Sequence, residues 1–268
     1  MRMTMALLLG TLVLAGCDNA EQTTTADSTG VNHPQTDRHG HKPVRIRIEL
    51  KKSAPECEGD GCPHVHVAWL NYEDQPVLNK AIETRLASML VRMEGDAVHD
   101  GSIEGLADAF LADAADMAMA SEQGWELSAT VKQQRCEQGL LTLSMESYEY
   151  TGGAHGQPNV GYFHWDVERQ QWLQLEDLLV PGQEAAFWTL AEQVHQDWLN
   201  AQELDDSFRD SWPFDKTDDV FFNKQGLVLQ YNVYHIAPYA MGQPQLTLPY
   251  AALKGILREQ YQPAITEH

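Results

Sequence analysis

One histidine lies in a glycine-rich stretch that interrupts strand-like sequence, and it is the residue most suggestive of chemistry. His155 is placed among the three glycines of TGGAHG, residues 151–156. A histidine can transfer protons in a hydrolysis when a carboxylate orients it, and Glu149 or Asp166 could do so. Glycines also let a backbone approach a neighbour closely, as a contact loop requires. The stretch therefore suggests either a hydrolase or a binding loop.

Other patterns that could support catalysis are weak. His64 and His66 fall two apart on a predicted strand and so share a face, but no third ligand follows at a metal-binding spacing. Ser144 and Ser147 lack the glycine elbow of a nucleophile, and no phosphate-binding glycine loop occurs. We expect no metal and no cofactor. The favoured interpretation is a protein that is not an enzyme, with a hydrolase using His155 as the alternative.

The N-terminus resembles a bacterial lipoprotein signal. A short apolar run after Arg2 ends in LAGC at residues 14–17, which resembles a lipobox. The run is too short to span a bilayer as a helix, so residues 1–16 are predicted to be a cleaved signal peptide. The resemblance implies that Cys17 carries palmitate-like acyl chains as a membrane anchor. Asp18 favours the inner membrane facing the periplasm, and the outer membrane remains possible.

The composition limits the partners of the chain. Residues 17–43 contain almost nothing to bury and are predicted to form a disordered tether. The formal net charge of −21 argues against binding to nucleic acid or to an anionic membrane surface, and it favours a cationic partner. The simpler explanation of this negative charge is that it keeps the protein soluble.

Three cysteines remain after the lipidation position. Cys57 and Cys62 flank a turn-forming segment, and closing it as a disulfide would contribute roughly 2 kcal/mol. Cys136 would then be the odd thiol. Pairing of Cys136 with either of the others is also possible, so three single-bridge pairings stay open.

Hydrophobic periodicity predicts an alternation of strands and helices. Strands are expected at 44–48, 65–69, 127–131, 141–145, 160–167, 220–222, 227–234 and 245–248. Helices are expected from Asn79 as N-cap, over 106–119, after Pro181 to Trp198, and over 250–259. This predicts an α+β fold with an antiparallel or mixed sheet, helices packed on one face, and two intimately associated subdomains at 44–150 and 151–262.

Two further stretches accompany TGGAHG, namely LQLEDLL at residues 173–179 and YHIAPYAMG at residues 234–242. Together they resemble the extracytoplasmic domain of otherwise unknown function that the RsiV anti-sigma factor shares with the non-catalytic region of the PdaC peptidoglycan deacetylase. The resemblance extends over residues of about 44 to 260.

This resemblance implies a binding domain, because RsiV binds lysozyme through it. The chain lacks the sigma-binding segment and membrane helix of RsiV and any deacetylase domain, so we expect neither activity. We therefore predict a lipid-anchored envelope protein that binds peptidoglycan or a lysozyme-like cationic protein. The candidate binding residues come from the two motifs and are Tyr150, Gly152, Gly153, His155, Gly156, His235 and Tyr239.

Overall fold

The computed structural model describes residues 44–55, 57, 59, 61–91, 99–117 and 124–262. The predicted signal peptide, Cys17 and the tether lie outside these residues. Within the described part of the chain, no helix is long and apolar enough to cross a membrane.

The larger subdomain is built on a six-stranded sheet with strand order β1-β2-β3-β4-β5-β6. All neighbours are antiparallel except β2 and β3, which run parallel, so the sheet is mixed. The strands are β1 (Arg45–Ser53), β2 (His64–Tyr72), β3 (Glu126–Glu137), β4 (Leu140–Tyr150), β5 (Gln157–Asp166) and β6 (Gln171–Leu173). The sheet thus continues beyond residue 150, where sequence alone suggested a subdomain boundary.

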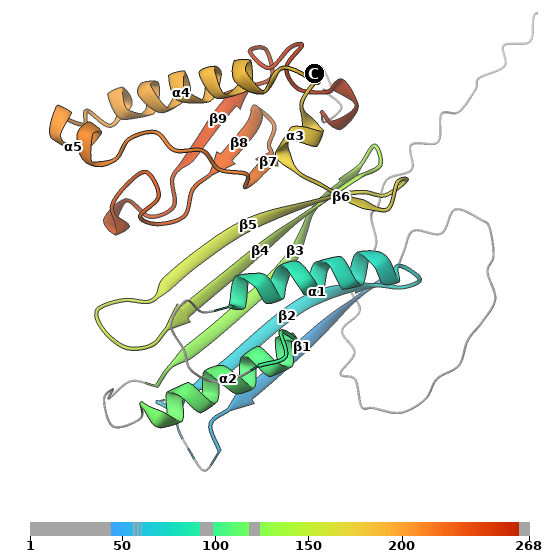
Figure 1. The fold of residues 1–268 in the computed structure, drawn as a ribbon, viewed down its shortest axis with the longest axis vertical. Coiled ribbons are helices and arrows are strands. Elements are labelled where there is room, and N and C mark those ends of the chain that lie inside the picture. Colours follow the sequence, from blue (N-terminus) through green and yellow to red (C-terminus); the bar gives the residue numbers. More distant parts are fainter. Residues whose placement is uncertain are drawn as a thin grey trace, which may run out of the picture.

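Helices α1 (Pro76–Leu90) and α2 (Ile103–Asp116) cover one face of this sheet (Figure 1). The apolar stripe of α1, including Ile82 and Leu86, packs with alternate residues of the strands in one core. The expected N-cap at Asn79 is wrong, because the helix begins one turn earlier at Pro76. The Asn79 amide instead accepts from the Tyr72 N–H at 2.7 Å and donates to the Tyr72 carbonyl at 2.8 Å. Asn79 therefore stabilises the end of β2 through hydrogen bonds to its backbone and does not cap the helix.

The smaller subdomain has a three-stranded antiparallel sheet of β7 (Val220–Phe222), β8 (Gly226–Gln230) and β9 (Gln245–Pro249). Its helices are α3 (Leu175–Leu178), α4 (Glu184–Ala201) and α5 (Asp206–Ser211), with short 3-10 turns at Tyr239–Met241 and Glu259–Tyr261. Buried residues of α4 and the sheet form a second core. The α+β fold with two subdomains is confirmed.

The expected helix over residues 250–259 is wrong. The segment consists of turns, and Leu253 and Leu257 reach the second core from it. Gly255 adopts a left-handed φ of 76°, which interrupts any right-handed helix at that point. The apolar residues of this segment are spaced as in a helix, but they belong to turns that bury Leu253 and Leu257.

Side chains of the smaller subdomain replace a missing strand along β5. Strand β6 pairs only with the end of β5, from His164 to Asp166. Further along, Asp219 accepts from the Tyr162 N–H at 2.9 Å, and the Asn232 amide bonds both the N–H and the carbonyl of Val160 at 2.7 and 3.1 Å. The exposed edge of β5 is thereby closed, which joins the subdomains.

A disulfide joins Cys57 and Cys62, whose Cα atoms are 5.7 Å apart. This is one of the three pairings that the sequence left open. No described cysteine is free, and this includes Cys136, so the expectation of an odd thiol at Cys136 is wrong.

Candidate functional site

The two sequence motifs, which are about eighty residues apart, meet in the structure. The loop between β4 and β5 places the ring of His155 against the ring of Tyr239, with centroids 3.7 Å apart and stacked. The Tyr239 hydroxyl donates to the Gly156 carbonyl at 3.0 Å, and the Tyr234 hydroxyl lies 3.3 Å from His155 Nε2. Three of the predicted site residues, His155, Gly156 and Tyr239, therefore form one contact between the subdomains.

The other predicted residues do not all join this contact. Tyr150 donates to the Gly153 carbonyl at 3.2 Å, and Gly152 and Gly153 adopt left-handed φ values of 104° and 88°, so these three shape the loop itself. His235 is turned elsewhere and lies 3.1 Å from an oxygen of Asp215.

Gly156 is required by a close approach. A Cβ added at this position would overlap the phenol ring of Tyr148, which lies directly over the glycine. The glycine-rich loop thus positions Tyr148, a residue that lines the neighbouring groove.

Removing the His155 ring tests how much this contact contributes to stability. His155 is exposed and touches the second subdomain through its stacked ring. We expect His155→Ala to lower the free energy of unfolding by about 1 kcal/mol while the fold is retained, since an aromatic pair contributes about that much. Urea denaturation followed by circular dichroism would measure it. Complete unfolding of the variant would contradict this description of the loop.

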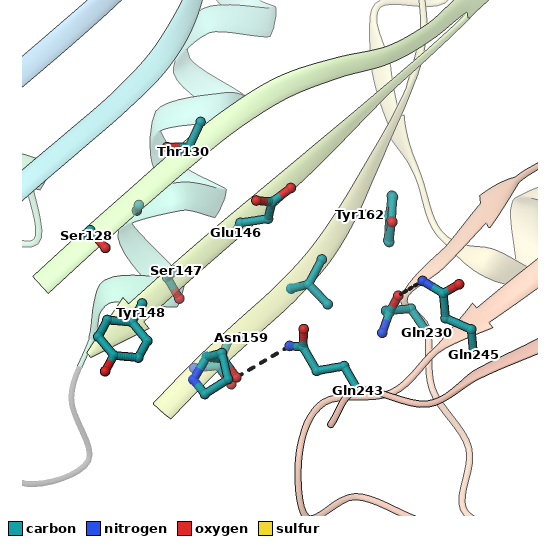
Figure 2. A pocket seen from close by; sticks show the side chains of 13 residues that line it. Ser128, Thr130, Glu146, Ser147, Tyr148, Asn159, Tyr162, Gln230, Gln243 and Gln245 are labelled. Atoms are coloured by element: carbon teal, nitrogen blue, oxygen red, sulfur yellow. Dashed lines mark hydrogen bonds between the residues drawn. The ribbon is translucent and has the colours of Figure 1, made fainter. Parts of the chain in front are cut away.

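A polar groove of about 470 Å³ includes Tyr148 and Pro158, which flank this loop in the sequence. Figure 2 shows the side chains that line the groove. It lies on the face of β3, β4 and β5 opposite the helices, where residues alternate with the core residues. Glutamines from the smaller subdomain, Gln230, Gln243 and Gln245, face these strands across the groove. The strand residues that line it are Ser128, Ala129, Thr130, Glu146, Ser147, Tyr148, Pro158, Asn159, Val160 and Tyr162.

The amide groups in the groove are held in fixed orientations. Gln245 donates to Gln230 Oε1 at 2.8 Å, and Gln243 donates to Asn232 Oδ1 at 3.0 Å and to the Pro158 carbonyl at 3.5 Å. Pre-oriented amides can donate to and accept from a polar ligand without losing freedom on binding.

The groove presents little free charge. Its only acidic lining residue among those described is Glu146, whose carboxylate is paired with Lys132 at 2.9 Å. Burial, together with the charges of Glu146 and Asp219, raises the pKa of Tyr162 to about 12, so this phenol stays protonated and can donate a hydrogen bond. The arrangement suits a neutral ligand rich in hydroxyl and amide groups.

Asp166, one of the two carboxylates predicted to orient His155, does not lie beside it. The ring nitrogens of His155 lie next to the Gly156 carbonyl, at 3.2 Å, and the Tyr234 hydroxyl. Asp166, at the other end of β5, accepts from the N–H groups of Glu168 and Arg169 at 3.0 and 2.9 Å and so closes a turn. Among the described residues, no three His, Cys, Asp or Glu side chains are grouped so as to hold a metal ion.

Sequence reasoning missed most of the groove. The alternation of polar and apolar residues along β3 and β4 carried a signal, because Ser128, Thr130 and Glu146 are its polar positions and share one face of the sheet. No local pattern predicted that the three glutamines belong to a site. Gln230 is the last residue of β8, Gln245 is the first of β9, and Gln243 lies just before β9.

Comparison with known proteins gives two family matches. Residues 62–157 match the family described as "Deacetylase PdaC", and residues 176–251 match "Protein of unknown function (DUF3298)". No curated protein matches the chain. The two matched ranges divide the chain near the junction between its subdomains.

Two solved structures resemble the chain over most of its length. A DUF3298 family protein from Pseudomonas aeruginosa PAO1 is 34% identical, with 83% of this chain and 97% of that chain covered and a TM-score of 0.69. A DUF3298 family member from Bacteroides fragilis NCTC 9343 shares the fold at 16% identity, with 81% and 94% covered and a TM-score of 0.62. The extent and identity of the first match place this chain in the DUF3298 family.

Proposed function

We propose that this protein is a lipid-anchored binding protein of the cell envelope, and that its polar groove takes a neutral glycan of the cell wall. The observation that carries the proposal is the groove lining, in which oriented amides and hydroxyls surround two tyrosines, Tyr148 and Tyr162. Sugar rings combine hydroxyl groups at their edges with apolar faces, so they match such a mixture of hydrogen-bonding and aromatic groups.

The anchor is part of the same proposal. Acylation of Cys17 would hold the folded part at the membrane through the tether 17–43, and Asp18 favours the inner membrane. A binding domain held in this way would face the peptidoglycan from the periplasm.

A cationic protein such as lysozyme is the second candidate partner. The net charge of −21 favours it, and α5 with its cap adds three acidic residues, Asp205, Asp206 and Asp210, on one short exposed segment. Such a charge distribution accelerates the encounter with a basic partner in a salt-dependent manner.

Calorimetric titration of the purified protein with chitotetraose, soluble peptidoglycan fragments and lysozyme would test both candidates. We expect saturable glycan binding that persists at physiological salt. Tyr148→Ala should weaken it about tenfold through lost stacking, and Gln245→Ala should weaken it severalfold through lost hydrogen bonds. Tyr148→Phe keeps the ring and should bind like the unaltered protein.

Trp172→Ala is the matched control, because Trp172 is 44% exposed but lies outside the groove. If the Tyr148 and Trp172 variants bound glycan equally well, the groove would not be the site. Binding of lysozyme alone, lost at high salt, would favour the cationic partner instead.

A further inference from the structure

A second groove lies on the opposite side of the six-stranded sheet from the glycan groove, and its character is different. It encloses about 670 Å³ between one side of α1 and the rings of Phe163 and Trp172. Two of its lining residues, Val77 and Trp172, remain 54% and 44% exposed. Exposed large apolar side chains gathered in one concave site indicate a binding surface.

The charges at this groove are of one sign. Lys80 and Arg85 line it, and no described carboxylate does, although the chain as a whole carries a formal charge of −21. The Arg85 guanidinium lies 5.7 Å from the Trp172 ring centre and 3.7 Å from Asp219, so its charge is partly compensated. No ion pair between described residues involves Lys80, whose ammonium group is therefore the cation available to an anionic ligand.

The groove offers few hydrogen-bond partners to the backbone of a bound peptide. Apart from the two cations, its polar side chains are Thr84 and Ser88, and the Ser88 hydroxyl already donates to the Arg85 carbonyl at 2.6 Å. A bound peptide would bury N–H and C=O groups without partners, which is costly, whereas a hydrocarbon chain has no such groups. The lining runs from Pro76 to Ser88 along α1, roughly 18 Å at the helical rise per residue, so an elongated ligand fits.

We propose that this groove binds a fatty acid, with the hydrocarbon tail along α1 against Trp172 and the carboxylate at Lys80. The site is separate from the glycan groove and does not depend on it. The net negative charge of the protein opposes adsorption to an anionic membrane surface, so the ligand is a single amphiphile and not a bilayer.

Titration of the full chain with dodecanoate below its micelle concentration would test this site. We expect saturable binding at one site, weakened at least tenfold by Lys80→Glu and by Val77→Asp. An acidic residue in the first turn of α1 complements the helix dipole, so Val77→Asp should leave the fold intact. Val167→Asp, at an exposed valine in the turn between β5 and β6, and Lys224→Glu, in a loop of the smaller subdomain, are the controls and should bind normally.

Dodecyltrimethylammonium carries the same tail with a cationic head and should bind at least tenfold more weakly than dodecanoate. Equal binding of the two amphiphiles would overturn the role of Lys80. Undiminished dodecanoate binding by the Val77→Asp variant would overturn the site itself.

Discussion

Substitution of Gly226 by alanine is expected to destabilise the protein by about 3 kcal/mol or more, because the added methyl group has no space. Gly226 pairs with Pro249 at the start of β8, and a Cβ there would overlap the backbone carbonyl of Leu248 on β9. Backbone atoms of a paired strand cannot move aside as a flexible side chain can. The strands would have to separate, and overpacking of this kind costs up to about 3 kcal/mol before lost strand pairing is included.

The same substitution also bears on function. Strands β8 and β9 carry Gln230 and Gln245, which face the six-stranded sheet across the polar groove. A displaced β8 would therefore weaken the proposed glycan binding together with stability. Chemical denaturation of the variant, followed by circular dichroism, would measure the first effect, and calorimetry the second.

Gly61→Ala is a matched control for this prediction. A Cβ at Gly61 meets nothing within 4 Å, and its backbone does not adopt the left-handed region. Both substitutions restrict the unfolded chain to the same extent, so their difference reports the folded state alone. Equal stability of the two variants would show that β8 and β9 are not packed as closely as described.

Acidification from pH 7 to pH 4 is expected to lower the free energy of unfolding by about 3 kcal/mol through one buried histidine. His164 lies at the junction of the subdomains, where its Nε2–H donates to the Val220 carbonyl at 2.8 Å and its Nδ1 lies 3.0 Å from the Thr142 hydroxyl. Burial is the main reason that the pKa of His164 falls from 6.5 to about 4; the hydrogen bond to the Val220 carbonyl opposes this shift, and the charge of Arg135 adds a smaller contribution to it.

The direction of the effect follows from which state binds the proton first. Below about pH 6.5 the unfolded chain takes up a proton at this histidine, whereas the folded protein takes it up only near pH 4. The stabilisation is thus complete above pH 6.5 and is lost as the pH falls toward 4. The full shift corresponds to about 3 kcal/mol at 1.36 kcal/mol per pKa unit. Burial also lowers the pKa of His195, and this group adds a loss in the same direction.

Urea denaturation at pH 7, 5.5 and 4 would measure this dependence. His164→Gln keeps a side-chain donor for the Val220 carbonyl but cannot titrate, so its stability should fall about 3 kcal/mol less over the same range. The same exchange at the exposed His155 is the control and should retain the pH dependence of the unaltered protein. An unchanged pH dependence in His164→Gln would assign the acid sensitivity to other groups.

Local patterns predicted most of the elements, and they failed where a side chain bonds a neighbouring element or where an element buries no residue. The alternation of Val65 and Val67, and of Leu141, Leu143 and Met145, predicted strands because a half-buried strand repeats every two residues. The sequence around Asn79 is typical of a helix N-cap, but the Asn79 amide forms hydrogen bonds with the Tyr72 backbone instead. The short α5 has no buried residue, and so it left no apolar pattern that could be recognised.

The candidate site, like the fold, was predicted in part from local patterns and in part not. From the sequence one could predict the alternation of strands and helices, the α+β class and two motifs that resemble one domain. The stacking of His155 on Tyr239, the turn closed by Asp166 and the three glutamines that face β3 to β5 across a groove became visible in the folded protein. Periodicity records which face of an element is buried, whereas a site depends on which faces meet across the junction of the subdomains.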